Sequence, residues 1–318
     1  MKYLINTSTD PYFNMAFDEF CLQQYECDEP FFYLWRNRPA VIIGLNQNAY
    51  SEVNLPYLNE KGITLARRVT GGGAVYHDLQ NMNYTIVGKD VTPEPFAEAL
   101  RKLGVPAELS GRNDIFVQGR KVSGYAARVW HDRSIVHGTM MYDVDLDTLS
   151  KVLDTPGSKM EAKGISSVKS RVANLKEYLP QFPSLDELQA KLQEILSDGD
   201  GVMPVSEEQL SQIKSIAQEK FASWDWIYGH SHEADLSHRR KLPCGTVEAR
   251  VCIDRGIITR IDFAGDFLGD LESEEVGKAL VGVKYLKSDV LSVLKGMDIS
   301  RHFKCTSAED LAELIVNQ

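Results

Sequence analysis

Short hydrophobic runs with the period of β-strands fill the first half of the chain. They lie at residues 31–35, 40–44, 63–67, 82–87, 114–117 and 136–144. Two helical patterns interrupt them. One begins at Asp10 and Pro11, which suit an N-cap and a first helical position, and the other covers residues 93–103. Strands mixed with a few helices, without regular alternation of the two, favour an α+β domain built on a mixed sheet.

The pattern becomes helical in the second half. Apolar residues recur at helical spacing over residues 184–196 and 206–221. Ser206 and Gln209 match a capping box at the start of the second of these helices. The polar, histidine-rich stretch at 224–240 is predicted to be a connection.

A hairpin and further helices are expected at the end of the chain. Residues 246–252 and 256–263 alternate as two paired strands do, and helical stretches follow. We place a domain boundary near residue 243, so that a first domain covers 1–243, including the helical connection, and a second covers 244–318.

Composition and charge narrow the class of protein. The chain has 318 residues, of which 43% are hydrophobic and 25% are charged, as in ordinary globular proteins. It has no apolar run as long as a membrane span, and its first residues lack the pattern of a signal peptide, so we expect a cytoplasmic protein without a membrane partner. A net charge of −10 argues against general nucleic-acid binding. Five scattered cysteines without a Cys-x-x-Cys pair indicate neither a disulfide framework nor a cysteine zinc knuckle.

Three consecutive glycines, Gly71, Gly72 and Gly73, are the most informative feature of the sequence. Without Cβ atoms, the backbone there can bend freely and approach a ligand closely. Their amides, turned inward together, would form a nest for a phosphate or carboxylate, with Arg67 and Arg68 adding positive charge at the rim. A tight turn without a ligand is the competing interpretation.

A second polar group lies downstream of the glycines. Asn113 and Asp114 stand at a strand entrance, where an amide offers hydrogen bonds and a carboxylate suits Mg²⁺. Lys121 follows a turn expected at Gln118 and Gly119, and on a hairpin strand it can point into a pocket as a compact charge. With the arginines and glycine amides, it would stabilise charge on a phosphate under attack, as phosphoryl and nucleotidyl transfer require.

Each of these features also has a structural alternative. Asn-Asp is a common turn pair, and Lys121 would also suit a solvated hairpin. His137, further along, often satisfies a backbone group in such a position. The sequence matches neither a Walker A loop nor a Rossmann glycine motif, so spacing alone names no substrate.

Several longer motifs occur in a fixed order along the chain. They are Arg67-Arg68-x-x-Gly71-Gly72-Gly73-x-Val75-x-His77-Asp78, Gly111-Arg112-Asn113-Asp114, Lys121-Val122-Ser123-Gly124, His137-Gly138-Thr139, the stretch from Ala162 to Leu175, Gly245-Thr246-Val247-Glu248 and Gly265-Asp266-Phe267. Together they resemble the lipoate–protein ligases over essentially the whole chain. The resemblance implies an α+β fold, with a large catalytic domain of mixed β-sheet flanked by helices, of the biotin/lipoate ligase type, and a small C-terminal α+β accessory domain.

The resemblance implies a two-step reaction through an adenylate intermediate. ATP and free lipoate form lipoyl-AMP and pyrophosphate, and a lysine of an acceptor protein then attacks the adenylate and releases AMP. ATP would be a co-substrate and Mg²⁺ an activator, with no tightly bound cofactor. The implied acceptors are lipoyl domains of 2-oxoacid dehydrogenases or the glycine-cleavage H protein. A monomer is expected, whose accessory domain swings between the two half-reactions.

The resemblance also assigns site residues. The pocket lysine of the family falls on Lys121, which would bind the lipoyl carbonyl and the phosphate in both steps. Lipoate and its carboxylate would contact Arg68, Thr70, Gly71, Gly72, Gly73, Ala74 and Val75. The nucleotide would contact Asn81, Asn113, Asp114, Ser123, Gly124, His137 and Thr139, with Asp114 also as the Mg²⁺ ligand.

One position departs from the family pattern. Cys244 precedes Gly245 where the family commonly has a second glycine, which would slightly stiffen a hinge. Cys244 with His230, His232 and His238 also allows a zinc site, but the irregular spacing favours a solvated polar linker.

Other functions remain as alternatives. The first is an ATP-independent octanoyl or lipoyl transferase, which would use a cysteine beside the pocket lysine. The catalytic motifs contain no cysteine, and Cys21 and Cys27 on or just after the first helix are expected to be buried small hydrophobic residues. A non-catalytic lipoate or nucleotide sensor would not need Lys121. A biotin ligase would usually carry a Gly-Arg-Gly-Arg loop, which is absent from the sequence.

Overall fold

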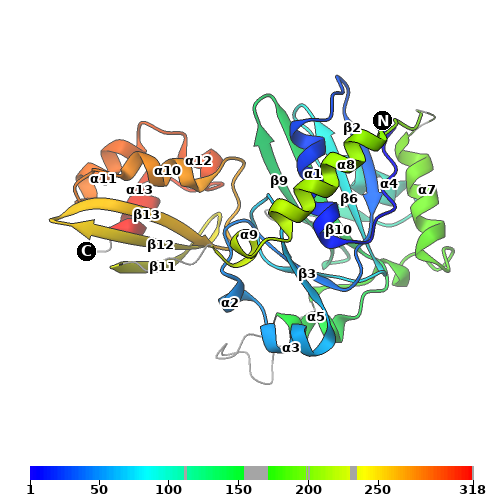
Figure 1. The fold of residues 1–318 in the computed structure, drawn as a ribbon. Coiled ribbons are helices and arrows are strands. Elements are labelled where there is room, and N and C mark those ends of the chain that lie inside the picture. The colour runs from blue at the N-terminus through cyan, green and yellow to red at the C-terminus, as the bar shows by residue number, and fades with distance from the viewer. Residues whose placement is uncertain (111–112, 154–170, 198, 200, 230–234, 317–318) are drawn as a thin grey trace.

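The computed structural model describes residues 1–110, 113–153, 171–197, 199, 201–229 and 235–316. Most of the Ala162–Leu175 motif, together with Gly111, Arg112, His230 and His232, lies outside these residues. Figure 1 shows a larger part and, beside it, a smaller C-terminal part. No helix in the described ranges has the length and apolar character that a membrane span requires.

The larger part is built on a seven-stranded mixed sheet. Its outermost pair, β1 and β2, is parallel, and the neighbours from β2 to β7 are antiparallel. In spatial order the strands are β1 (Lys2–Tyr3), β2 (Phe31–Trp35), β6 (Asn81–Gly88), β10 (Arg133–Met141), β9 (Arg120–Trp130), β8 (Asp114–Val117) and β7 (Ala107–Ser110). The mixed sheet confirms the α+β class expected from the sequence.

Helices cover both faces of this sheet. Phe32, Leu34 and Tyr84 pack on one face against α4 (Glu94–Lys102) and α7 (Leu185–Ser197). Phe31 and Tyr33, which alternate with them along β2, pack on the other face against α1 (Pro11–Gln23) and α8 (Glu207–Ile216). Figure 1 shows α1 and α8 side by side across the sheet. Because both faces are covered, every residue of β2 and β6 is buried.

A second, three-stranded sheet carries the glycine loop. β3 (Ala40–Ile43) lies between β4 (Thr64–Arg67), which is parallel to it, and β5 (Val75–His77), which is antiparallel. The glycines connect β4 to β5. The short helices near this sheet are α2 (Ala49–Glu52), α3 (Leu55–Lys61), α5 (Leu146–Val152) and α9 (Trp224–Tyr228). A 3₁₀ turn (Leu175–Glu177) and a π-helical turn after α8 (Ala217–Phe221) pack in the cores of the seven-stranded sheet.

The smaller part is an antiparallel sheet covered by helices on one side (Figure 1). The hairpin expected there is formed by β12 (Gly245–Asp254) and β13 (Ile257–Gly265). β11 (Leu236–Leu242) adds a third strand beside β12. The helices are α10 (Ser273–Leu280), α11 (Lys287–Leu294), α12 (Ile299–His302) and α13 (Ala308–Ile315).

Local signals in the sequence were accurate at several helix ends and turns. Asp10 caps α1 by accepting from the amides of Tyr12 and Phe13, and the capping box of Ser206 is present. The connection predicted over 224–240 is wrong, because this stretch contains α9 and β11. β11 was missed because its residues alternate between half-buried and exposed positions at the edge of a sheet and are mostly polar, which leaves a weak hydrophobic signal. The division of domains at residue 243 stays a prediction.

Candidate active site

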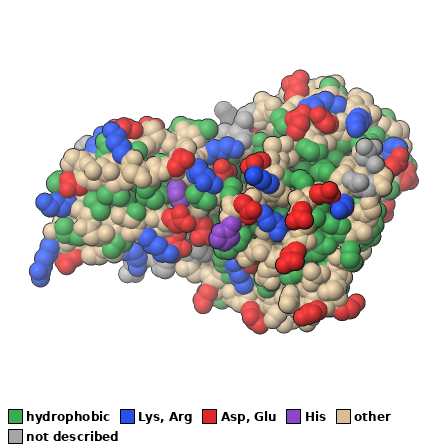
Figure 2. All heavy atoms as spheres, turned by 90° about the horizontal axis from the view of Figure 1, so that it is seen from above, with side chains coloured by type: hydrophobic (Ala, Val, Ile, Leu, Met, Phe, Trp, Pro, Cys, Tyr) green, Lys and Arg blue, Asp and Glu red, His purple; other side chains and the backbone are tan. Residues whose placement is uncertain are grey.

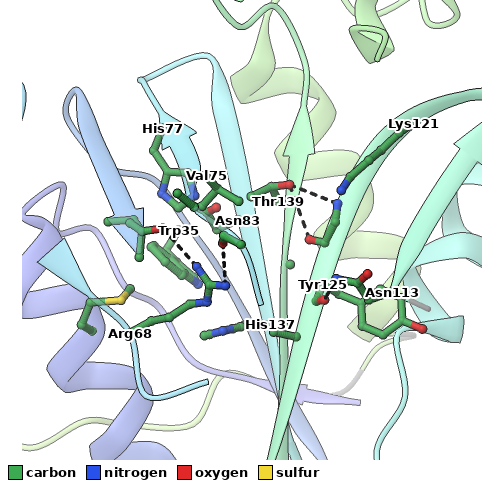
Figure 3. A pocket seen from close by; sticks show the side chains of 17 residues that line it. Trp35, Arg68, Val75, His77, Asn83, Asn113, Lys121, Tyr125, His137 and Thr139 are labelled. Atoms are coloured by element: carbon green, nitrogen blue, oxygen red, sulfur yellow. Dashed lines mark hydrogen bonds between the residues drawn. The ribbon is translucent and has the colours of Figure 1, made fainter. Parts of the chain in front are cut away.

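A pocket of about 120 Å³ lies where the seven-stranded sheet meets the three-stranded sheet. Its walls come from α1, β2, β3, the glycine loop, β5, β6, β9 and β10, with one residue from the entrance of β8. In Figure 3, Trp35, Arg68, Val75 and His77 lie on one side, and Asn113, Lys121 and Tyr125 lie on the other. The lining residues are Met15, Trp35, Ile42, Arg68, Gly73, Ala74, Val75, His77, Asn83, Asn113, Lys121, Gly124, Tyr125, Ala126, His137, Gly138 and Thr139.

Lys121 reaches the pocket because of an irregularity in its hairpin. Gln118 and Gly119 both have positive φ, as the expected tight turn requires. The register between β8 and β9 then shifts, so that Phe116 pairs with Lys121 while Ile115 pairs with Ser123. This bulge interrupts the two-residue alternation of β9. As a result Lys121 contacts Gly124, three positions further on.

Gly124 leaves the space that the lysine occupies. A Cβ placed on Gly124 would lie 2.8 Å from Lys121 Nζ, closer than real contacts allow. The same Nζ lies 2.7 Å from Asp114 Oδ1, and both side chains are only partly exposed. Asp114 therefore neutralises Lys121 at one end of the pocket. Asn113 is fixed beside them because its Nδ2 donates to the carbonyl of Tyr125.

The two arginines before the glycines are buried, so their predicted place at the rim is wrong. Arg68 donates to the carbonyls of Gly71 (2.6 Å) and Gly73 (2.8 Å) and holds the loop in shape. Arg67 lies below the loop, where its guanidinium donates only to backbone carbonyls, those of Gly44, Leu45, Gln47, Trp226 and Ile227. Burial lowers the pKa of each arginine to about 10, so both stay charged at neutral pH.

The glycine loop is packed between the two parts of the molecule. Gly72, with φ of +91°, donates its amide to the carbonyl of Phe267 at 3.0 Å. A Cβ on Gly71 would lie 2.6 Å from that same oxygen. The predicted nest of glycine amides is therefore wrong at Gly72, whose N–H is already bound by the C-terminal part.

Two further contacts join the parts near this loop. Arg128 forms an ion pair with Glu272, and it also donates to the carbonyl of Val69, next to the glycine loop. The amide of Val129 donates to the carbonyl of Asp270 at 2.9 Å. The motif around Gly265 and Phe267 thus serves to hold the C-terminal part on the glycine loop.

A buried polar network supports the floor of the pocket. His137 Nδ1 lies 2.6 Å from Asp18 Oδ2, and His137 Nε2 lies 2.6 Å from Thr70 Oγ1. The second carboxylate oxygen of Asp18 accepts from Tyr33 and Thr85. Sequence reasoning missed Asp18, because a single acidic residue on an apolar helix carries no motif.

The predicted site residues fall into two groups. Those that line the pocket are Arg68, Gly73, Ala74, Val75, Asn113, Lys121, Gly124, His137 and Thr139. Those that lie outside its lining are Thr70, Gly71, Gly72, Asn81, Asp114 and Ser123. Members of the second group contact the first: Thr70 accepts from Arg68, Asn81 donates to the lining residue Asn83, and Asp114 pairs with Lys121.

Three of the lining residues that the predictions omitted come from apolar stretches. Trp35, Ile42 and Met15 look like ordinary core positions in the sequence. Strand alternation could have assigned a face to Trp35 on β2 and Ile42 on β3, and helical spacing could have done so for Met15 on α1, but nothing in the sequence identifies the element opposite each face. His77 and Gly138 stood within quoted motifs but received no role.

No cysteine of the described residues lines the pocket. Cys21 is fully buried, and burial raises the pKa of its thiol well above the usual value. Cys27 is only partly buried, so the expected burial of this residue is wrong, and neither cysteine lines the pocket. Within the described residues no group of three or more His, Cys, Asp or Glu side chains could hold a metal ion. His238 Nε2 instead lies 3.1 Å from the hydroxyl of Tyr285, and Cys244 is buried.

Comparison with known proteins agrees with this architecture. Residues 10–197 match the family model described as lipoyl protein ligase A/B catalytic domain, and residues 231–315 match that of the bacterial lipoate protein ligase C-terminus. Lipoate-protein ligase LplJ of Bacillus subtilis is 37% identical over 96% of this chain and 97% of its own length. Lipoate–protein ligase 1 of Staphylococcus aureus is 33% identical over 99% of this chain and all of its own.

Solved structures support the same assignment. The crystal structure of P. falciparum LipL1 in complex with lipoate has a TM-score of 0.84 at 24% identity, covering all of this chain and 99% of that one, and shows the two-part fold. A lipoate-protein ligase A bound with ATP has a TM-score of 0.62 at 28% identity and covers 72% of this chain and 99% of its own. The fold is that of a two-part α+β ligase. The chain belongs to the lipoate–protein ligase family.

Proposed function

We propose that this enzyme activates free lipoate with ATP and transfers the lipoyl group to a lysine of an acceptor protein. The observation that carries the proposal is the position of Lys121, whose ammonium group stands at one end of a pocket with apolar walls beyond it. An apolar pocket ending in a positive charge suits a carboxylic acid with a long hydrocarbon chain.

In the first half-reaction, the lipoate carboxylate attacks the α-phosphorus of ATP, and pyrophosphate leaves. Lys121 stabilises the negative charge that the carboxylate and the phosphate bring together, which is the main catalytic task in such a transfer. Asp114 keeps the lysine in place before substrates arrive, since their Nζ and Oδ1 atoms are 2.7 Å apart. In the second half-reaction, the acceptor amine attacks the carbonyl carbon, an amide forms, and AMP leaves with the electron pair of the broken bond.

We further propose a division of the pocket between its ligands. The acyl chain lies along Ala74 and Val75 towards Trp35, and the nucleotide lies near Asn113, Gly124 and Thr139. Thr70, Gly71, Gly72, Asn81 and Ser123 support these contacts from behind.

Asp114 is the proposed ligand for Mg²⁺. A single carboxylate suits this ion, which usually keeps several waters and is otherwise bound by substrate phosphates. Bound there, the ion would neutralise phosphate charge. The residue that must adjust is Lys121, because it now occupies one oxygen of Asp114.

The proposed acceptors are lipoyl domains and the glycine-cleavage H protein. A structure titled as a bipartite lipoate protein ligase and its E2 lipoyl domain from Thermoplasma acidophilum, at 29% identity and a TM-score of 0.66, supports the first of these. The expected monomer and its cytoplasmic location stay predictions. The transferase alternative is disfavoured because no cysteine of the described residues lines the pocket.

The test is ATP–pyrophosphate exchange that depends on lipoate and Mg²⁺. We expect exchange in the unchanged protein, loss in Lys121→Ala, and normal exchange in Lys191→Ala, a matched control on the exposed face of α7. If exchange needs an acceptor, apo H protein is added. Modification of that acceptor from an acyl-carrier donor without ATP would overturn the proposal in favour of a transferase.

A further inference from the structure

His77 is a pocket residue whose hydrogen bonds define its protonation. It lies on β5, is 3% exposed and packs edge-on against Trp35, with ring centroids 6.0 Å apart. Its Nδ1 lies 3.0 Å from the side-chain nitrogen of Asn37. Its Nε2 is buried and has no hydrogen-bond partner among the described residues.

The orientation of Asn37 follows from its neighbour Asn14. Asn14 Nδ2 donates to the backbone carbonyls of Ser8 and Arg36, and its Oδ1 accepts from Asn6, so its amide has only one consistent orientation. The same Nδ2 also approaches Asn37 Oδ1 at 2.7 Å. Asn37 Nδ2 is therefore the atom that faces His77, and it is a donor.

This chain of donors determines the tautomer of His77. Because Asn37 donates to Nδ1, Nδ1 must be an unprotonated acceptor, and the ring proton must be on Nε2. Burial, with smaller contributions from the charges of Arg68 and His137, lowers the pKa of His77 to about 3. The ring is thus neutral at neutral pH and presents an unpaired Nε2–H.

Apart from Asn83, the other polar side chains at this end of the pocket are already hydrogen-bonded. Trp35 Nε1 donates to Thr85, the guanidinium of Arg68 donates to the glycine loop, and both ring nitrogens of His137 have partners. Among the described lining residues, Asn83 is the one other residue with a buried side-chain polar atom, its Nδ2, that has no hydrogen-bond partner.

The surroundings of the unpaired donor favour a ligand atom over water. A buried water needs two to four polar partners, and the side chains of Trp35, Ile42 and Val75 offer it none. Of the described lining side chains, only His77 and Asn83 have a buried polar atom without a partner, and both atoms are donors, so a water there would have no acceptor among these two. A buried donor left unpaired is costly, so the site suits a mainly apolar ligand with one weak acceptor. Figure 3 shows His77 across the pocket from Lys121, which is where the end of an acid remote from its carboxylate would lie.

We propose that His77 determines specificity for the sulfur-bearing end of the acid: its Nε2–H donates a hydrogen bond to a ring sulfur of the lipoyl group. This inference rests on the proposed function. Sulfur is a weak acceptor, so the bond is modest, yet an acid without sulfur leaves the buried donor unpaired. The site therefore prefers lipoate over an acid of the same shape and over octanoate.

The first test compares acids that differ only in this acceptor. Cyclopentylpentanoate has the shape of lipoate with methylene groups in place of sulfur, and octanoate has no ring. In the exchange assay, we expect kcat/KM of the unchanged protein to favour lipoate over cyclopentylpentanoate by about tenfold, and this ratio to fall to about one in His77→Phe. In Asn83→Leu, which removes the other unpaired donor, the ratio should stay high. An unchanged ratio in His77→Phe, or a loss confined to Asn83→Leu, would overturn the inference.

The second test needs no substitution and so does not depend on the folding of a variant. In ¹⁵N-histidine NMR of the full chain, His77 should carry its proton on Nε2 from about pH 5 to about pH 8, where an ordinary histidine titrates. The Nε2–H signal should shift with lipoate and stay in place with cyclopentylpentanoate. Asn37→Leu removes the donor to Nδ1 and should mix the tautomers and lower the lipoate ratio. A proton on Nδ1 in the unchanged protein would refute the inference.

These outcomes separate the inference from the function on which it rests. If the unchanged protein activates none of the three acids, even with acceptor present, the proposed function is wrong. If it activates all three equally, the ligase function stands and the role of His77 is wrong.

Discussion

Replacing Gly71 by alanine should loosen the contact between the glycine loop and the C-terminal part. The new Cβ would lie 2.6 Å from the carbonyl oxygen of Phe267, and ordinary contact begins at 3.4 Å, so a separation of 3.4 − 2.6 = 0.8 Å is needed. The hydrogen bond from Gly72 N to this oxygen is 3.0 Å long and would not survive such a movement.

The expected magnitude combines two terms. The net loss of one hydrogen bond costs about 1 kcal/mol, and overpacking costs about 1–3 kcal/mol. A total of about 2–4 kcal/mol would lower the equilibrium constant for docking at least about thirtyfold. Undocking should stay partial, because the bonds from Val129 N to Asp270 O and from Gly265 N to Asn46 O are untouched.

Gly73→Ala is the matched control. A Cβ at Gly73 has Asp266 Cβ, 4.0 Å away, as its nearest neighbour, and neither Gly71 nor Gly73 has a positive φ that alanine would resist. The assay is amide hydrogen exchange by mass spectrometry. Peptides that contain Gly72 or Phe267 should exchange faster in Gly71→Ala than in Gly73→Ala or the unchanged protein. Equal exchange in all three would refute the reasoning.

Three further predictions follow from single sites. Asp114→Ala should weaken Mg²⁺-dependent adenylation, measured as pyrophosphate exchange against Mg²⁺ concentration, and an unchanged Mg²⁺ dependence would remove the metal role. The pKa of His77 is about 3 in the folded protein and about 6.5 in the unfolded chain. Between these pH values the unfolded chain binds more protons at this residue than the folded protein does. As the pH falls through that range, His77 therefore lowers the free energy of unfolding by up to about 1.4 kcal/mol per pH unit. Urea unfolding should show a smaller acid loss in His77→Phe, and equal losses would contradict the assignment. Phe96→Ala should lower the free energy of unfolding by about 3–5 kcal/mol, because the ring is fully buried and stacks on Tyr84 with ring centroids 4.0 Å apart. Trp224 is exposed, so Trp224→Ala should leave the midpoint of urea unfolding nearly unchanged. A similarly small effect in both variants would show that the core tolerates the cavity.

Local chemistry made much of the fold predictable. The cap at Asp10, the capping box at Ser206 and the turn at Gln118 each depend on residues a few positions apart, and all three formed as expected. The strand at residues 31–35 was placed correctly because a continuous apolar run of that length suits a strand covered on both faces.

Contacts between distant segments limited what could be predicted of the site. Arg67 and Arg68 were expected at the rim because charged side chains usually are exposed. In the fold, both are buried beneath the glycine loop and donate to carbonyls from several segments. The spacing of residues in the sequence does not predict these contacts. Likewise, the bulge in β9 decided that Gly124 would share the pocket with Lys121, while Ser123 would not line it.

The sequence by itself determined the family, the α+β class and the segments that combine charged residues with glycines, because motifs and local propensities depend only on residues close together in the chain. Only the tertiary structure decided which of those residues face the pocket. It also placed Asp18 behind His137 and Asn37 behind His77, and so determined which polar groups remain free for a ligand. The physical reason is that a hydrogen bond in a buried site joins segments that are brought together by packing, and packing is a property of the whole fold.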